Sequence, residues 1–132
     1  MYSFNKNSKK NLSTCHADLQ RLFNRVIELR DCTIVWGYRG EADQNAAYNR
    51  GDSTKQFPNS KHNRMPSNAV DVAPYIKGGI SWEKKQAYEF AGYVARVAEE
   101  MGIKIRRGAD WNSDVDVNDQ GLLDPLHFEV IK

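Results

Sequence analysis

Two histidines and one aspartate are the residues of this 132-residue chain best suited to joint chemistry. His62 lies in a polar stretch, His127 opens an apolar run near the end of the chain, and Asp71 stands in the middle of Ala69–Ala73. An ionised carboxylate on a partly buried strand is costly unless it is paired or binds a metal. Each residue alone has an ordinary alternative, which is solvent exposure or a hydrogen bond. Together, two imidazoles and a carboxylate match a zinc site with one open, catalytic position.

Two acidic residues near His127 could complete such a site. A zinc hydrolase needs a base next to the reacting water, and Asp124 precedes His127 by three residues. The alternative for Asp124 is a turn residue, because it comes directly before Pro125. Glu129 shares strand parity with His127, so its carboxylate could orient that imidazole through a hydrogen bond.

The composition predicts one folded domain over residues 1–132, because 40% of the residues are hydrophobic and 27% are charged. Residues 1–12 are polar and basic, and they are interpreted as an N-terminal arm. Cys15 and Cys32 are too few for a disulfide framework. We therefore expect reduced thiols and synthesis in the cytoplasm.

The hydrophobic pattern predicts helices and strands in an uneven alternation. Helices are expected at 14–30, 41–50 and 81–101, strands at 32–36, 69–73, 103–106 and 127–131, and long polar loops at 51–68 and 108–124. Ser13 or Thr14 would cap the first helix, Ser81 would cap the third, and Gly102 would end it. Pro74 would stop the second strand. This order fits an α+β domain with a mostly antiparallel sheet flanked by helices, and parallel βαβ winding fits less well.

The charge distribution argues against nucleic-acid and membrane partners. The net charge is only +2. Lys6, Lys9, Lys10 and the pair Arg106–Arg107 lack the interleaved aromatic residues and the motif that nucleic-acid binding would require. The polar N-terminus has no apolar signal-peptide core, and no apolar stretch approaches the length of a membrane span.

The motifs around the candidate residues resemble those of a known family. They are Ser60-x-His62, Ala69-Val70-Asp71, Asp124-x-x-His127-Phe128-Glu129, Gly37-Tyr38-Arg39 and Gly108-Ala109-Asp110-Trp111. In this order, over residues 32–131, they resemble the D-alanyl-D-alanine carboxypeptidase and vancomycin-resistance dipeptidase family. They are most similar to its branch of L-alanyl-D-glutamate endopeptidases that serve as phage endolysins. The segment between His62 and Asp71 is longer than the common family pattern and lacks a glycine after the histidine, which bears on substrate specificity.

The resemblance implies a fold like that of Hedgehog and D,D-peptidase domains, and it implies roles for individual residues. His62, Asp71 and His127 would bind one zinc ion, and Asp124 would be the general base. Arg39 would polarise the scissile carbonyl and stabilise the oxyanion; a surface salt bridge is its alternative. Ser60 and Trp111 would line the substrate groove, although Trp111 could equally pack in the core.

The resemblance also implies a substrate and a setting. The substrate would be the stem peptide of bacterial peptidoglycan, cut at the L-alanyl-D-glutamate bond. An endolysin made in the host cytoplasm without a signal peptide would act as a monomer on the wall after holin-type release. Two alternatives stay open: a D-alanyl-D-alanine carboxypeptidase or dipeptidase, and a non-catalytic zinc-containing module that binds the cell wall. Asp124 separates the last from an enzyme, because a binding module needs no base.

A second metal site is conceivable in the loop at 108–124. Asp114, Asp116, Asn118 and Asp119 alternate oxygen donors of the kind that calcium prefers. The spacing lacks the glycine that an EF-hand loop has at its sixth position. A solvated acidic loop is the simpler interpretation.

Overall fold

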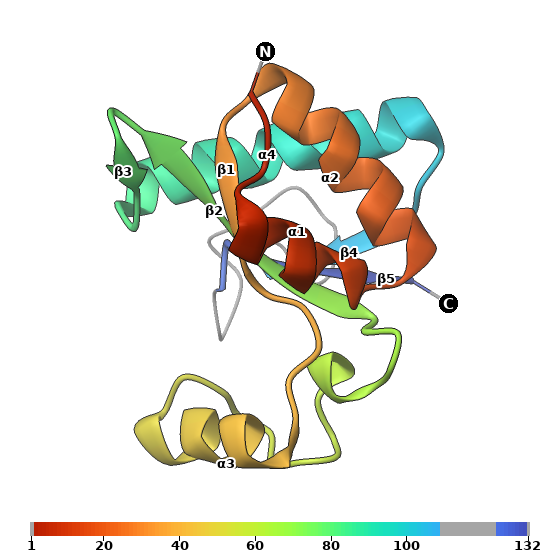
Figure 1. The fold of residues 1–132 in the computed structure, drawn as a ribbon, viewed down its shortest axis with the longest axis vertical. Coiled ribbons are helices and arrows are strands. Elements are labelled where there is room, and N and C mark those ends of the chain that lie inside the picture. Colours follow the sequence, from red (N-terminus) through yellow and green to blue (C-terminus); the bar gives the residue numbers. More distant parts are fainter. Residues whose placement is uncertain (1, 109–123, 132) are drawn as a thin grey trace.

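The fold is an antiparallel sheet covered by helices in a computed structural model that describes residues 2–108 and 124–131 (Figure 1). The elements are α1 (Lys6–Ser13), α2 (Ala17–Leu29), β1 (Cys32–Trp36), α3 (Glu41–Arg50), the 3-10 helix η1 (Lys61–Asn63), β2 (Ala69–Ile76), β3 (Gly79–Ile80), α4 (Lys84–Met101), β4 (Ile105–Arg107) and β5 (His127–Val130). The strand order is β1-β2-β5-β4, and β3 pairs with β2. All of these pairs are antiparallel, which confirms the predicted α+β class.

The hydrophobic core lies on one face of the sheet, beneath α2 and α4. Phe128 of β5 is fully buried and packs edge-on against Phe23 of α2 and Phe90 of α4, with ring centroids 5.4 and 6.4 Å away. Side chains alternate between the two faces of a strand. Val70 on β2 and Phe128 on β5 are fully buried on the core face. Their chain neighbours Asp71 and His127 therefore point to the opposite face.

The N-terminal stretch expected to be an arm instead carries α1. Asn5 caps this helix, since its side chain accepts a hydrogen bond from the Ser8 backbone N–H at 2.8 Å. Phe4 and Leu12 are buried in the core, and the Ser8 hydroxyl accepts a 3.0 Å bond from the N–H of Ile34 on β1. Two apolar residues in a polar stretch are too few to predict a helix by periodicity, so packing against β1 orders it.

Some predicted boundaries were wrong because local contacts overrode them. The helix expected at 14–30 begins at Ala17, since Thr14 ends α1 and His16 caps α2. Leu29 shares the helical spacing of the apolar residues in this helix, yet it is 49% exposed at the end of α2. The strand expected to stop at Pro74 runs to Ile76. Proline has no backbone N–H. It is tolerated in a strand at a position whose N–H would not donate a hydrogen bond to the neighbouring strand.

The later elements follow their predicted order with small shifts. Glu83 rather than Ser81 caps α4, and its carboxylate accepts from the Gln86 N–H at 2.7 Å. The strand expected at 103–106 is β4 at Ile105–Arg107, and the strand expected at 127–131 is β5. Gly102 ends α4 in the left-handed conformation with φ 71°, as predicted.

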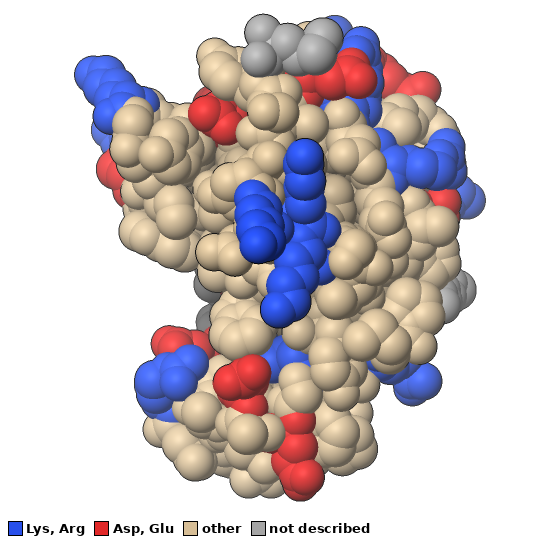
Figure 2. Space-filling model, in the orientation of Figure 1, with Lys and Arg blue, Asp and Glu red and all other residues tan. Residues whose placement is uncertain are grey.

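The surface carries exposed basic side chains, and both thiols are buried. Figure 2 shows basic side chains gathered over α1, where Lys6, Lys9 and Lys10 are exposed. No helix within the described ranges is both long and apolar enough to cross a membrane. Cys15 and Cys32 are free and buried. Burial raises the pKa of each thiol to about 12, so neither is a ready nucleophile.

Candidate metal centre

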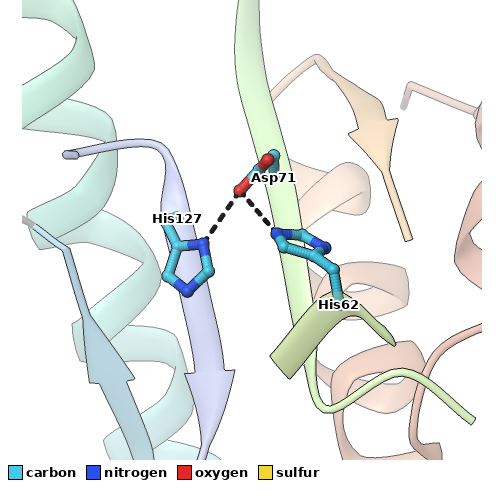
Figure 3. A group of neighbouring side chains, drawn as sticks. All are labelled: His62, Asp71 and His127. Carbon is cyan, nitrogen blue, oxygen red and sulfur yellow. Dashed lines mark hydrogen bonds and ion pairs between the residues drawn. The ribbon is translucent and has the colours of Figure 1, made fainter. Parts of the chain in front are cut away.

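His62, Asp71 and His127 converge on one point of the face of the sheet opposite to the hydrophobic core (Figure 3). Asp71 and His127 lie opposite each other in the β2–β5 pair, and η1 carries His62 to the same place. The Asp71 Oδ1 atom lies 3.3 Å from His62 Nε2 and 3.0 Å from His127 Nδ1. One ligand atom from each residue lies within 4.8 Å of the others. This group could hold a metal ion.

The outer nitrogens of both imidazoles are occupied by other partners. His62 Nδ1–H donates to the Gly37 carbonyl at 2.9 Å. His127 Nε2–H donates to the Glu129 carboxylate at 2.8 Å. In neutral rings these bonds leave the inner nitrogens as acceptors, both facing the acceptor oxygen of Asp71. Three converging acceptors repel one another unless a proton or a cation lies between them, so the donor set fits a metal.

Asp71 and His127 change each other's pKa through their shared hydrogen bond and their charges. Burial disfavours an ionised His127, yet its hydrogen bonds with Asp71 and Glu129 outweigh this and raise its pKa to about 10. Burial would likewise raise the pKa of Asp71, but the charge of His62 and the hydrogen bonds from both rings hold it well below its usual range. Without a metal, the proton on His127 compensates the Asp71 carboxylate.

Metal binding is therefore expected to release protons. At pH 8 His127 of the metal-free protein is protonated, since its pKa is about 10, and a bound imidazole must be neutral. We expect release of about one proton per metal ion from this residue, fading as the pH rises through 10. Titration calorimetry in buffers of different ionisation enthalpy measures the number. A binding enthalpy independent of the buffer at pH 8 would contradict the assignment.

Backbone geometry on both sides of His62 places its ring. Ser60 and Asn63 form a capping box around η1, and the Ser60 hydroxyl accepts from the His62 N–H at 3.2 Å. The Arg39 N–H donates to the His62 carbonyl at 2.8 Å. A Cβ on Gly37 would overlap the Asn11 carbonyl and the hydroxyl of Thr14. Only glycine therefore lets the Gly37 carbonyl reach the imidazole while α1 packs behind it.

Arg39 is buried beside the carboxylate of the site. Its Nη2 donates to Asp71 Oδ2 at 3.1 Å, which leaves Oδ1 to face the two histidines. Its Nη1 donates to Gln44 at 3.2 Å, and its guanidinium lies 4.9 Å from the centre of the Trp36 ring. A bulge between Ile34 and Trp36 sets Trp36 opposite Asp71. Within residues 2–108 and 124–131, Arg39 Nε has no hydrogen-bond partner.

Gln44 is a site residue that the sequence patterns did not predict. It is fully buried on α3, and its amide nitrogen donates to Ser53 and to the Lys55 carbonyl at 2.9 and 2.7 Å. Its oxygen accepts from Arg39 and from Asn63, both at 3.2 Å. Because α3 is polar on all sides, no periodicity distinguishes this one buried amide. Figure 1 shows α3 apart from α2 and α4. The hydrogen bonds between Gln44 and Arg39 and between Arg39 and Asp71 connect α3 to β2 of the sheet.

Comparison with known proteins agrees with this geometry. The family model described as phage L-alanyl-D-glutamate peptidase matches residues 1–131. The chain belongs to this family. The L-alanyl-D-glutamate peptidase of Escherichia phage T5 is 38% identical over an alignment of 142 residues, which covers 98% of both chains. The crystal structure of the L-Ala D-Glu endopeptidase ChiX of Serratia marcescens matches with a TM-score of 0.75 at 28% identity, covering 98% of this chain and 90% of ChiX.

In this phage L-alanyl-D-glutamate peptidase family member, Asp124 lies in the turn that leads into β5. Its carbonyl accepts from the His127 N–H at 3.1 Å. Burial raises the pKa of the Asp124 carboxyl, and the negative charge of Asp71 raises it further against the opposing positive groups of the site. A raised pKa suits a group that must take up a proton near neutral pH.

Other predicted residues of this peptidase have different outcomes. Glu129 is buried and bonded to His127, as the strand parity suggested. Ser60 is buried and caps η1, and a substrate contact for it stays a prediction. Trp111 and the acidic residues considered for calcium, Asp114, Asp116, Asn118 and Asp119, lie outside the described residues.

Proposed function

We propose that this chain is a zinc-dependent endopeptidase that cleaves the L-alanyl-D-glutamate bond in the stem peptide of bacterial peptidoglycan. The observation that carries the proposal is the convergence of His62, Asp71 and His127, whose outer hydrogen bonds turn the inner nitrogens of both rings toward the Asp71 carboxylate. The names of the related peptidases supply the substrate class.

Zinc is the proposed metal because of the donor set. Two imidazole nitrogens and one carboxylate oxygen form the three-ligand arrangement of catalytic zinc sites, which keep a fourth position open. A bound zinc ion would lower the pKa of water and polarise a carbonyl oxygen. The Glu129 carboxylate would hold the His127 ring in its binding orientation, and the Gly37 carbonyl would do the same for His62.

The remaining chemistry falls to Asp124 and Arg39. The Asp124 carboxylate would accept a proton from the attacking water and pass it to the leaving amine of the glutamate. Arg39 would hold negative charge that develops on the scissile carbonyl oxygen. Its place in the site supports this role, since Gln44 and Trp36 fix the guanidinium and its Nε–H has no partner in the described part of the chain.

The proposed setting is that of a phage endolysin. The protein would be made in the host cytoplasm and would reach the wall as a monomer after holin-type release. The rival enzyme activity is removal of the terminal D-alanine from the same stem peptide. Because both reactions use the same substrate, the mass of the product distinguishes them.

The test is digestion of purified muropeptides, followed by mass spectrometry of the products. We expect a peptide that begins at D-glutamate, and no product before zinc is restored to protein treated with a chelator. Restoring zinc should recover the rate, because the Gly37 carbonyl and the Glu129 carboxylate hold the two imidazoles in place. Loss of only a terminal D-alanine would replace the proposal with a carboxypeptidase, and full activity after complete metal removal would exclude a metal mechanism.

A further inference from the structure

Gly108 contacts both Asp124 and His127 through its backbone. Its N–H donates to the His127 carbonyl at 2.9 Å, and its carbonyl accepts from the Asp124 N–H at 3.0 Å. It directly follows β4, whose pairing with β5 aligns Arg107 with Phe128 and Arg106 with Glu129. Gly108 thus extends the sheet register to the turn that holds the proposed base.

The chain of Asp124 approaches Gly108 too closely for any side chain. A Cβ at position 108 would overlap the Asp124 carbonyl oxygen and would lie 2.8 Å from its carbonyl carbon and 3.0 Å from its Cβ. Among the glycines that the structure describes, only Gly37 and Gly108 would place a Cβ this close to other atoms. The obstacle at Gly108 is mainly backbone, which cannot move aside by a side-chain rotation.

We propose that Gly108 is a positioning residue that sets the place of the Asp124 carboxylate relative to the metal ligands. The inference rests on the proposed function, in which Asp124 is the base. The β4–β5 ladder supplies the rigid frame, and the bare Cα of Gly108 lets the turn at Asp124 pack directly against it. The His127 backbone bonds to both Gly108 and Asp124, but its imidazole is held by two further contacts, the pairing of His127 with Asp71 and the bond to Glu129. A side chain at 108 should therefore displace the base and spare the ligands.

Gly108→Ala is the direct test, with Gly92→Ala as its matched control. Gly92 lies exposed on α4, where an added Cβ meets nothing within 4 Å. For Gly108→Ala on purified muropeptides we expect kcat to fall roughly 100-fold, as for a displacement of about 1 Å, with KM little changed. Zinc affinity, measured by competition with a chromogenic chelator, should stay within about threefold of wild type, because the ligands keep their own partners.

A double-mutant cycle separates positioning of the base from general damage. If Gly108 acts through Asp124, then Gly108→Ala should cause no further loss of kcat in an Asp124→Ala background. An additional loss of similar size, or a parallel loss of zinc affinity, would overturn the inference, as would unchanged kcat in the single variant. If Asp124→Ala alone keeps its kcat, the assigned base fails instead.

A stabilised background keeps the test available if Gly108→Ala weakens folding. Alanine is the better helix former at the exposed Gly92, so Gly92→Ala should raise the melting temperature. The cycle is then run in that background and read by the same kcat, KM and zinc affinities. The double variant is expected to bind zinc and to stay about 100-fold slower than Gly92→Ala.

Discussion

Asp124→Ala is expected to lower kcat on muropeptides by roughly 10²–10⁴-fold while zinc stays bound, which is the range a positioned acid–base group contributes. The three candidate ligands are His62, Asp71 and His127, so removing Asp124 takes no ligand away. Burial raises the pKa of the Asp124 carboxyl, which favours uptake of a proton during the reaction. Product mass spectrometry gives kcat, and metal analysis of the purified variant gives the zinc content.

Two further variants sharpen that result. Asp124→Asn keeps the shape of the side chain but cannot accept the proton, so it should lose as much activity as the alanine variant. Asp18→Ala removes an exposed carboxylate of α2 that lies near Arg21 and His16, away from the metal site, and should leave kcat unchanged. An asparagine variant with near wild-type kcat would show that Asp124 is not the base.

His62→Ala is expected to lose the metal, and all activity with it. Loss of one of three ligands should weaken zinc binding by more than about a hundredfold, because loss of an outer partner alone typically costs 10–100-fold. The substitution also removes the imidazole that bonds both the Gly37 carbonyl and the Asp71 carboxylate, and it leaves a cavity between them. Zinc affinity from chelator competition and zinc content after dialysis measure the effect.

His16→Ala is the matched control, since the chain has three histidines and only this one lies outside the site. His16 caps α2 by accepting from the Asp18 N–H at 3.0 Å. Its loss should cost roughly 1 kcal/mol of stability, as for other helix caps, with no change in zinc affinity. Stoichiometric tight zinc in His62→Ala would show that this histidine is not a ligand.

Much of the fold could be predicted because its signals are local. Apolar residues at helical spacing placed the core of α2 at Leu19, Leu22, Phe23, Val26 and Ile27, all of which are buried. The β-branched run at Cys32–Trp36 became β1. Boundaries shifted where a cap or a partner strand decided them, as at Glu83 and Pro74. The free energies of such contacts exceed small differences in propensity.

The sequence by itself determined which residues could meet at a metal, because a carboxylate between two valines needs a partner and only two histidines lie in suitable places. Tertiary structure alone decided what supports them. Gln44 beneath Arg39, the Gly37 carbonyl behind His62 and the bare Cα of Gly108 against Asp124 all act through contacts between distant segments. Such contacts leave no periodic mark on the chain, since they depend on how the packed elements approach one another and not on the spacing within any one of them.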